Sequence, residues 1–195
     1  MVSNATSGVH PIARSEGSAR STNRPSQRAL RALIRVDHAG EFGAVRIYDG
    51  QIAVLDRKNL HHEELQHMRE QEREHHARFS ELLANRNVRP TILLPLWHVA
   101  GYAVGLTTAL MGPEAAMACT EAVEDAVVEH YDEQLALLGD SEPELSSIVA
   151  RIRDEELEHR DHAITAGAHD TPGHTLVYGA IRFGCRIAIA ISKIL

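Results

Sequence analysis

Four long segments of this chain each carry a glutamate in the middle of the helical face that should be buried. In the ranges 34–55, 65–82, 117–138 and 145–166, apolar residues recur at alternating spacings of three and four, the period of one face of an α-helix. The glutamates at the centres of these stripes are Glu41, Glu72, Glu124 and Glu156. In the second and fourth stripes, His75 and His159 follow three residues after the glutamate and share its face.

Four buried carboxylates require a source of positive charge. Desolvating one ionised carboxylate is costly even after relaxation, and four in one layer also repel one another. The stripes supply no arginine, whereas two divalent cations cancel four carboxylate charges and leave neutral imidazoles to complete the coordination. A Glu from each of two helices and a Glu-x-x-His pair from each of two others is the ligand set of ferritin-like di-iron and di-manganese bundles.

We therefore predict a centre of two metal ions. Its predicted ligands are Glu41, Glu72, His75, Glu124, Glu156 and His159. An oxygen-rich set of this kind suits iron and manganese better than zinc, which prefers fewer ligands in a tetrahedron.

The same pattern occurs twice along the chain. Tyr48, Asp49, Gln51, Ala53 and Leu55 follow Glu41 at the offsets at which Tyr131, Asp132, Gln134, Ala136 and Leu138 follow Glu124. Glu72 lies 31 residues after Glu41, and Glu156 lies 32 residues after Glu124. A duplicated helical hairpin that folds into a four-helix bundle accounts for this repeat. A third Glu-x-x-His pair, Glu64 and His67, breaks the repeat and leaves the apolar stripe, so we exclude it.

The chain is predicted to be all-α, because no strand-like alternation bounded by turn residues occurs in it. Clusters of Gly, Pro, Asn and Asp divide it into six helices. The predicted helices span residues 27–56, 59–86, 92–111, 113–138, 143–169 and 173–195. Pro113 and Pro143 fall at helix starts, where the missing N–H of proline is harmless. The fold predicted is a ferritin-like four-helix bundle with two additional helices.

The third and sixth predicted helices differ from the other four. From Pro90 to Pro113 the chain has no Asp, Glu, Lys or Arg, and from His174 onward it has basic residues, no acidic residue and a broad aliphatic face. A basic amphipathic helix is typical of a membrane interface. Both helices have small residues at every fourth position, which lets helices approach closely. These are Gly101, Gly105 and Ala109, and Ala180, Gly184 and Ala188. We expect two membrane-interface helices, and ordinary core or dimer helices are the alternative.

Composition narrows the function classes. The formal net charge of −7 argues against sequence-independent nucleic-acid binding. The two cysteines, Cys119 and Cys185, exclude a disulfide framework and a thiolate metal site, and they fit a reducing compartment. Residues 1–26 lack the apolar core of a secretory signal. We expect these residues to be a disordered tail, with an organelle-targeting peptide as the alternative, before one metal-binding domain over residues 27–195.

Several acidic residues and one histidine near the predicted ligands are candidates for supporting roles. Four of them can orient the ligand imidazoles by accepting their second N–H, which would raise the basicity of the imidazoles. These four candidates are Asp37, His38, Asp154 and Asp161. Glu121 and Glu129 flank Glu124 and are expected to face solvent or to lie behind the ligands.

The remaining aromatic and imidazole side chains have less specific expectations. Tyr48 and Tyr131 lie two turns beyond Glu41 and Glu124, as core residues with a hydroxyl partner or as pocket residues. Trp97 and His98 are expected to anchor an interface. The histidines expected at the surface are His61, His62, His76 and His162.

Ordered motifs along residues 30–195 resemble the demethoxyubiquinone hydroxylase family of ubiquinone biosynthesis. The motifs are Asp37-His38-Ala39-Gly40-Glu41, the Glu72/His75 pair, Pro95-Leu96-Trp97, Ala118-Cys119-Thr120, Asp154-Glu155-Glu156-Leu157-Glu158-His159 and Gly184-Cys185-Arg186-Ile187-Ala188-Ile189. The resemblance implies a membrane-bound di-iron monooxygenase. Such an enzyme inserts one oxygen atom of O₂ into the ring of a demethoxylated polyprenyl quinone, a 2-polyprenyl-3-methyl-6-methoxy-1,4-benzoquinol.

The resemblance also assigns roles to residues of this chain. The family's iron ligands fall on the six residues predicted above, with Glu72 and Glu156 bridging two Fe ions. The family's His-Tyr pair near the quinone ring falls on His130 and Tyr131.

The partners that the resemblance implies are a polyprenyl quinone, O₂, membrane lipid and an electron donor. The donor is a reduced nicotinamide or a reductase, although the chain has no G-x-G-x-x-G fingerprint of a dinucleotide domain. The implied location is the bacterial inner membrane facing the cytoplasm, with the matrix side of the mitochondrial inner membrane as the alternative. A homo-oligomer or a complex of ubiquinone-biosynthesis proteins is compatible with it.

Three other functions stay open from the residues alone. A ferritin-type ferroxidase or iron-storage protein shares the ligands, as does another di-iron oxygenase. A membrane-scaffold bundle would share the helices and bind no metal.

Overall fold

The computed structural model describes residues 25–55 and 61–194. Its elements are α1 (Gln27–Val54), α2 (His62–Asn85), α3 (Leu94–Met111), α4 (Pro113–Leu138), the short 3₁₀ helix η1 (Gly139–Ser141), α5 (Pro143–Thr165), a second 3₁₀ helix η2 (Ala168–Asp170) and α6 (His174–Ser192). No strand occurs within the described ranges, so the all-α prediction is confirmed. The division of the chain near residue 26 stays a prediction, because residues 1–24 lie outside the described part.

Local chemistry explains most of the helix ends. The Ser26 hydroxyl accepts a hydrogen bond from the Ala29 N–H and caps α1. Pro113 and Pro143 begin α4 and α5, as predicted. The predicted helix over 143–169 ends earlier, at Thr165, because Gly167 adopts a left-handed conformation with φ 95°. The predicted boundaries at 56 and 59 fall in the segment that the structure leaves undescribed.

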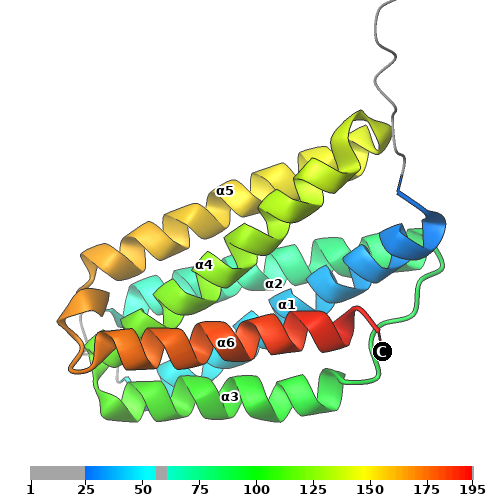
Figure 1. Ribbon diagram of the computed structural model, residues 1–195. Helices are drawn as coiled ribbons and strands as arrows, with labels where there is room; N and C mark the ends of the chain where they lie inside the picture. The colour runs from blue at the N-terminus through cyan, green and yellow to red at the C-terminus, as the bar shows by residue number, and fades with distance from the viewer. Residues whose placement is uncertain (1–24, 56–60, 195) are drawn as a thin grey trace, which may run out of the picture.

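The four repeat helices form a bundle with the predicted acidic layer at its middle. α1 packs on α2 and α4 packs on α5, so each half of the repeat is a helical hairpin (Figure 1). One apolar cluster, which includes Ile34, Phe79 and Ile152, fills the bundle on one side of this layer. A second, which includes Leu65, Met117 and Ala163, fills the other side. The carboxylates therefore lie between two layers of buried apolar side chains.

The predicted stripes are correct in phase and inexact at their edges. All residues of the predicted stripe on α2 are buried. On α1, Val45 and Ile52 are only half-buried, whereas Ala44 and Gln51 are buried. The reason is that α1 also packs along α3, which turns its buried face by about one residue.

α3 and α6 lie on the same side of the bundle, α3 against α1 and α6 against α4 (Figure 1). The predicted close approach is present at α3, where a Cβ added to Gly105 would lie 1.9 Å from the Ile47 carbonyl oxygen. It is wrong for α6 at Gly184, because no heavy atom lies within 4 Å of a Cβ added there. The Trp97 Nε1–H donates to Ser192 Oγ at 3.2 Å and links the two helices.

The outer faces of α3 and α6 are apolar and exposed. Large exposed side chains on them are Leu96, Val99, Leu110, Met111, Leu176, Phe183, Ile187 and Ile191. Both helices are long and apolar enough to cross a membrane by length and composition alone. Their exposure rules out the alternative that they are ordinary core helices, because a core helix would bury these side chains.

Candidate metal centre and adjoining pocket

All six predicted ligands meet in the middle of the bundle. Their donor atoms form two overlapping groups, and within each group these atoms all lie within 4.8 Å of one another. One group is Glu41, Glu72, His75 and Glu156, and the other is Glu72, Glu124, Glu156 and His159. Glu72 and Glu156 belong to both groups, so their carboxylates lie where the two groups overlap. Each of the six is at most 5 % exposed.

Both ligand histidines aim their Nδ1 atoms at this layer. His75 Nδ1 lies 3.0 Å from Glu156 Oε1 and 3.5 Å from Glu41 Oε2. His159 Nδ1 lies 3.0 Å from Glu156 Oε2 and 3.2 Å from Glu72 Oε1. The two histidines thus occupy matching places on opposite sides of the shared carboxylates.

Buried polar atoms that lack a hydrogen-bond partner test whether the centre fits metal ions. Both carboxylate oxygens of Glu72, Glu156 Oε1 and His75 Nδ1 are buried without a hydrogen-bond partner of good geometry. Buried polar atoms normally have a partner, and four orphans at one point are unusual. A divalent cation in each group would satisfy them, so this donor set fits two such ions. The excluded pair lies apart from the layer, since Glu64 is half-buried and His67 is exposed.

The charge balance of the centre depends on its histidines when no cation is bound. Burial raises the pKa of Glu41 and of Glu124 well above the usual value. Burial would raise the pKa of Glu72 as well, but its contacts with His159 and His75 hold that pKa below the usual value. Burial lowers the pKa of His159, yet hydrogen bonds with Glu156 and Glu72 raise it to about 11 overall. Without a bound cation, the buried carboxylates therefore favour protonated imidazoles.

The second nitrogen of each ligand imidazole has a partner that the sequence analysis missed. The His75 Nε2–H donates to Glu155 Oε2 at 2.6 Å, and the His159 Nε2–H donates to Gln71 Oε1 at 3.1 Å. These bonds fix the tautomer that leaves each Nδ1 lone pair facing the centre. Gln71 and Glu155 each immediately precede the glutamate of a Glu-x-x-His pair, and this shared position was the available signal.

The four residues predicted to orient the imidazoles do other things, so that prediction is wrong. Asp37 accepts hydrogen bonds from His130 and Gln134. His38 Nδ1 is buried without a partner, and its ring lies 4.4 Å from the ring of His76. Both remaining aspartates face outward, where each is paired with an arginine. They are Asp154 with Arg153 and Asp161 with Arg160.

Two buried tyrosines cross between the halves and hold the outer glutamates. The Tyr48 hydroxyl on α1 donates to Glu124 Oε1 on α4 at 2.8 Å. The Tyr131 hydroxyl on α4 donates to Glu41 Oε1 on α1. Burial and the nearby carboxylates raise the pKa of both phenols, so they stay protonated donors. Of the two expectations for these residues, core residues with a hydroxyl partner fits both, and Tyr131 also lines a pocket.

An apolar cavity of about 350 Å³ lies between the bundle and the two outer helices α3 and α6. It is lined from α1, α3, α4 and α6, by residues such as Gly43, Val104 and Ile181. A smaller pocket shares five of its lining residues and reaches the four glutamates, His130 and Tyr131. The shared residues are Val36, Gly40, Ala44, Val127 and Ile189. The apolar cavity therefore lies directly beside the pocket that contains the carboxylates.

Comparisons with known proteins agree with this arrangement. The model of the family described as Ubiquinone biosynthesis protein COQ7 matches residues 28–192. The chain belongs to this family. It is 47 % identical over 186 residues to the 3-demethoxyubiquinol 3-hydroxylase of Rhodospirillum rubrum, a match that covers 95 % of this chain and 88 % of that protein.

Eukaryotic members of the COQ7 family are almost as similar. The NADPH-dependent 3-demethoxyubiquinone 3-hydroxylase, mitochondrial, of Homo sapiens is 45 % identical over 86 % of this chain and 79 % of its own length. The 5-demethoxyubiquinone hydroxylase, mitochondrial, of Saccharomyces cerevisiae is 43 % identical over 82 % and 76 %. The predicted family is confirmed, and with it a hydroxylating enzyme on a ferritin-like bundle.

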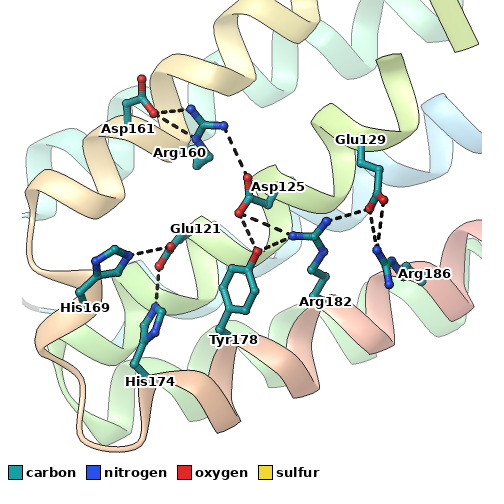
Figure 2. A network of polar contacts seen from close by, with 10 residues as sticks. All are labelled: Glu121, Asp125, Glu129, Arg160, Asp161, His169, His174, Tyr178, Arg182 and Arg186. Carbon is teal, nitrogen blue, oxygen red and sulfur yellow. Dashed lines mark hydrogen bonds and ion pairs between the residues drawn. The ribbon is translucent and has the colours of Figure 1, made fainter. Parts of the chain in front are cut away.

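Two expectations, those for Glu121 and His62, are wrong in this COQ7 family member. Glu121 does not face solvent, because it is 5 % exposed and both its oxygens contact imidazoles (Figure 2). Glu129 remains partly exposed, as expected, and contacts Arg182 and Arg186 of α6. His62 is buried, and its Nδ1–H donates to the Leu55 carbonyl at 2.8 Å.

Proposed function

We propose that this protein hydroxylates the ring of a demethoxylated polyprenyl quinol, using O₂ and a di-iron centre, at a membrane surface. The observation that carries the proposal is the apolar cavity between α3, α6 and the bundle, which adjoins the smaller pocket lined by the buried carboxylates. A soluble iron-storage protein has no need of such a cavity. The printed names of the relatives supply the substrate class, since they act on demethoxyubiquinol or demethoxyubiquinone.

The six converging side chains are the proposed iron ligands. His75 and Glu41 would contribute to one metal site and His159 and Glu124 to the other, with Glu72 and Glu156 available to both. When bound, two ferrous ions supply electrons to O₂ together, which is the oxidising chemistry that hydroxylation requires. The protein contributes rigid helices, tyrosines that fix the outer glutamates and two dry layers that exclude water.

The cavity is the proposed site of the quinone. Its lining is almost entirely aliphatic or glycine, which suits a methyl-substituted ring and the first isoprene units of a tail. A polyprenyl tail is insoluble in water, so the mouth of the cavity must face lipid. The exposed apolar side chains of α3 and α6 surround that side and support a location on the membrane.

His130 is proposed to act beside the quinone ring, and its neighbour Tyr131 is proposed to position Glu41. The His130 Nε2–H donates to Asp37 Oδ1 at 3.0 Å, and both residues line the small pocket. The hydrogen-bonded pair of His130 and Asp37 can hold a proton next to a ring oxygen of the quinone. Tyr131 already donates to Glu41, so its role is to position that ligand rather than to bind substrate.

Electrons come from outside this chain in our proposal. The name of the human relative includes NADPH dependence, which supports a reduced nicotinamide as donor. The proposed location is the membrane that holds the ubiquinone pool, at the bacterial inner membrane or at its mitochondrial counterpart. The relative from Rhodospirillum rubrum supports the bacterial location, and the mitochondrial relative from Saccharomyces cerevisiae supports the mitochondrial one.

The test is product analysis with purified iron-loaded protein, demethoxyubiquinol, a reductant and ¹⁸O₂ in liposomes. We expect one ¹⁸O atom in the ring and two irons per chain by elemental analysis. Iron loading far above two per chain without hydroxylated product would instead indicate a ferritin-type protein. Two bound irons without any ring product would indicate a different di-iron oxygenase, and no iron would indicate a scaffold.

A separate measurement tests the membrane face. Phe183, which is 66 % exposed on α6, is replaced by aspartate, and binding to vesicles is measured by co-sedimentation. We expect weaker vesicle binding with unchanged helical content and metal content. Equal vesicle binding by the two proteins would contradict the proposed orientation.

A further inference from the structure

A second cluster of metal-binding side chains lies at the beginning of α6, outside the carboxylate centre (Figure 2). Glu121 of α4 is flanked by His169 of η2 and by His174, the first residue of α6. His169 Nε2 lies 2.9 Å from Glu121 Oε1, and His174 Nε2 lies 2.7 Å from Glu121 Oε2. The ligand atoms of all three lie within 4.8 Å of one another.

This cluster is the first step of a polar ladder between α4 and α6, and it differs from the other steps. Asp125 and Glu129, one and two turns along α4, contact Arg182 of α6 (Figure 2). Glu121 has no arginine or lysine contact among the residues that the structure describes. Among the described residues, the side-chain partners of this carboxylate, which is 5 % exposed, are therefore two imidazoles.

We propose that Glu121, His169 and His174 bind a divalent transition-metal ion of the zinc class. Imidazole and carboxylate ligands suit zinc, whereas the oxygen-rich centre in the bundle suits iron. Around a tetrahedral zinc ion with bonds of about 2.0–2.1 Å, ligand atoms lie about 3.3 Å apart. In the structure the two imidazole nitrogens contact different oxygens of Glu121, at 2.9 and 2.7 Å, and the three ligand atoms lie within 4.8 Å of one another, so rotations of these side chains bring them around one ion.

The geometry predicts an exchangeable ion rather than an enclosed one. The His169 side chain is 59 % exposed, so solvent reaches the site and water completes the coordination. The ion would join three separate elements, α4, η2 and the first residue of α6. Because α6 lines the apolar cavity, its attachment to α4 sets one wall of that cavity.

The test compares the protein as purified, with its carboxylate centre loaded with iron, with the double variant His169→Gln/His174→Gln. Glutamine keeps a hydrogen-bond donor for Glu121 and removes the imidazole, so the double variant should fold. Both proteins are equilibrated with micromolar zinc, and zinc and iron per chain are then measured by elemental analysis. His98→Gln, which removes an exposed imidazole outside the cluster, is the matched control.

We expect one zinc per chain beyond the iron in the wild type and in His98→Gln, and none in the double variant. Zinc should also raise the thermal midpoint of the wild type and leave that of the double variant unchanged. Cobalt(II) should give the visible absorption of a low-coordinate site only where both histidines are present. Equal zinc content in the wild type and the double variant, at equal iron content, would overturn the proposal. So would the absence of additional zinc in the wild type.

Discussion

The two halves of the bundle present the same ligands, but the residues behind those ligands are different. In the α1–α2 half, His75 donates to the carboxylate of Glu155, whereas in the α4–α5 half, His159 donates to the amide of Gln71. Gln71 and Glu155 occupy equivalent positions in the repeat, immediately before Glu72 and Glu156.

The same contrast recurs around the outer glutamates. Gln134 donates to Asp37, and its repeat equivalent Gln51 donates to Thr120, the equivalent of Asp37. Asp37 also accepts from His130, for which the other half has Ile47. The charged and titratable supporting groups thus gather around the position of His75 and Glu41. The ligands are thus symmetric in the two halves, whereas the side chains behind them are not.

The helices outside the bundle differ as well. α3 packs closely on α1, with a Cβ on Gly105 excluded by the backbone of Ile47. α6 is held on α4 by the polar ladder that begins at Glu121. One contact depends on the absence of a side chain and the other on charge, so they should respond to different substitutions.

The largest effect is expected from the residues that both halves share. Glu156→Ala removes a ligand common to both groups, so we expect loss of both metal ions and of hydroxylation. Glu124→Ala, which belongs to one group only, should leave one ion bound. Elemental analysis and product analysis check this, and full metal content in Glu156→Ala would contradict the assignment.

Gly105→Ala tests the packing of α3. The added Cβ would lie 1.9 Å from a backbone oxygen, so the helices must separate, and we expect a loss of about 3 kcal/mol in the free energy of unfolding. The matched control is Gly184→Ala, where no atom lies within 4 Å, and a gain of about 0.5 kcal/mol is expected. Chemical denaturation measures both, and similar values for the two variants would contradict this account.

His38→Leu tests a buried histidine that only the first half has at this position, since the repeat equivalent of His38 is Glu121. Burial and the nearby His76 lower the pKa of His38 from 6.5 to about 4. Between these values the unfolded chain takes up a proton that the folded protein does not, so stability falls as the pH drops from 6.5 to 4. The leucine variant should lose about 2 kcal/mol less over this range. Unfolding at several pH values checks it, and parallel profiles would count against a buried neutral His38.

Glu155→Gln makes the two halves more alike and should have the smallest effect. Replacing the carboxylate behind His75 with an amide keeps a hydrogen bond but lowers the basicity of the imidazole, so metal affinity at that position should fall about tenfold. Gln71→Glu is the reciprocal variant and should raise affinity at the position of His159. Metal titrations report both, and unchanged affinities would mean that the asymmetry has no consequence for binding.

Sequence periodicity was sufficient to predict the helices and the set of inward-facing glutamates. A side chain's phase on a helix is fixed by its position, and an apolar stripe marks the buried face, so Glu41, Glu72, Glu124 and Glu156 could be predicted to point inward. The phase was less exact for α1, where Val45 and Ile52 are half-buried, because a third helix shares that face.

The amino-acid sequence by itself determined the helices, the repeat and which side chains converge, because these follow from local periodicity. Only the tertiary structure decided the partners across helices, namely Glu155 and Gln71 behind the histidines, the crossed tyrosines, and Glu121 between His169 and His174. Such contacts depend on the rotation and offset of one helix against another. Residues distant in the chain set these, and no single segment encodes them.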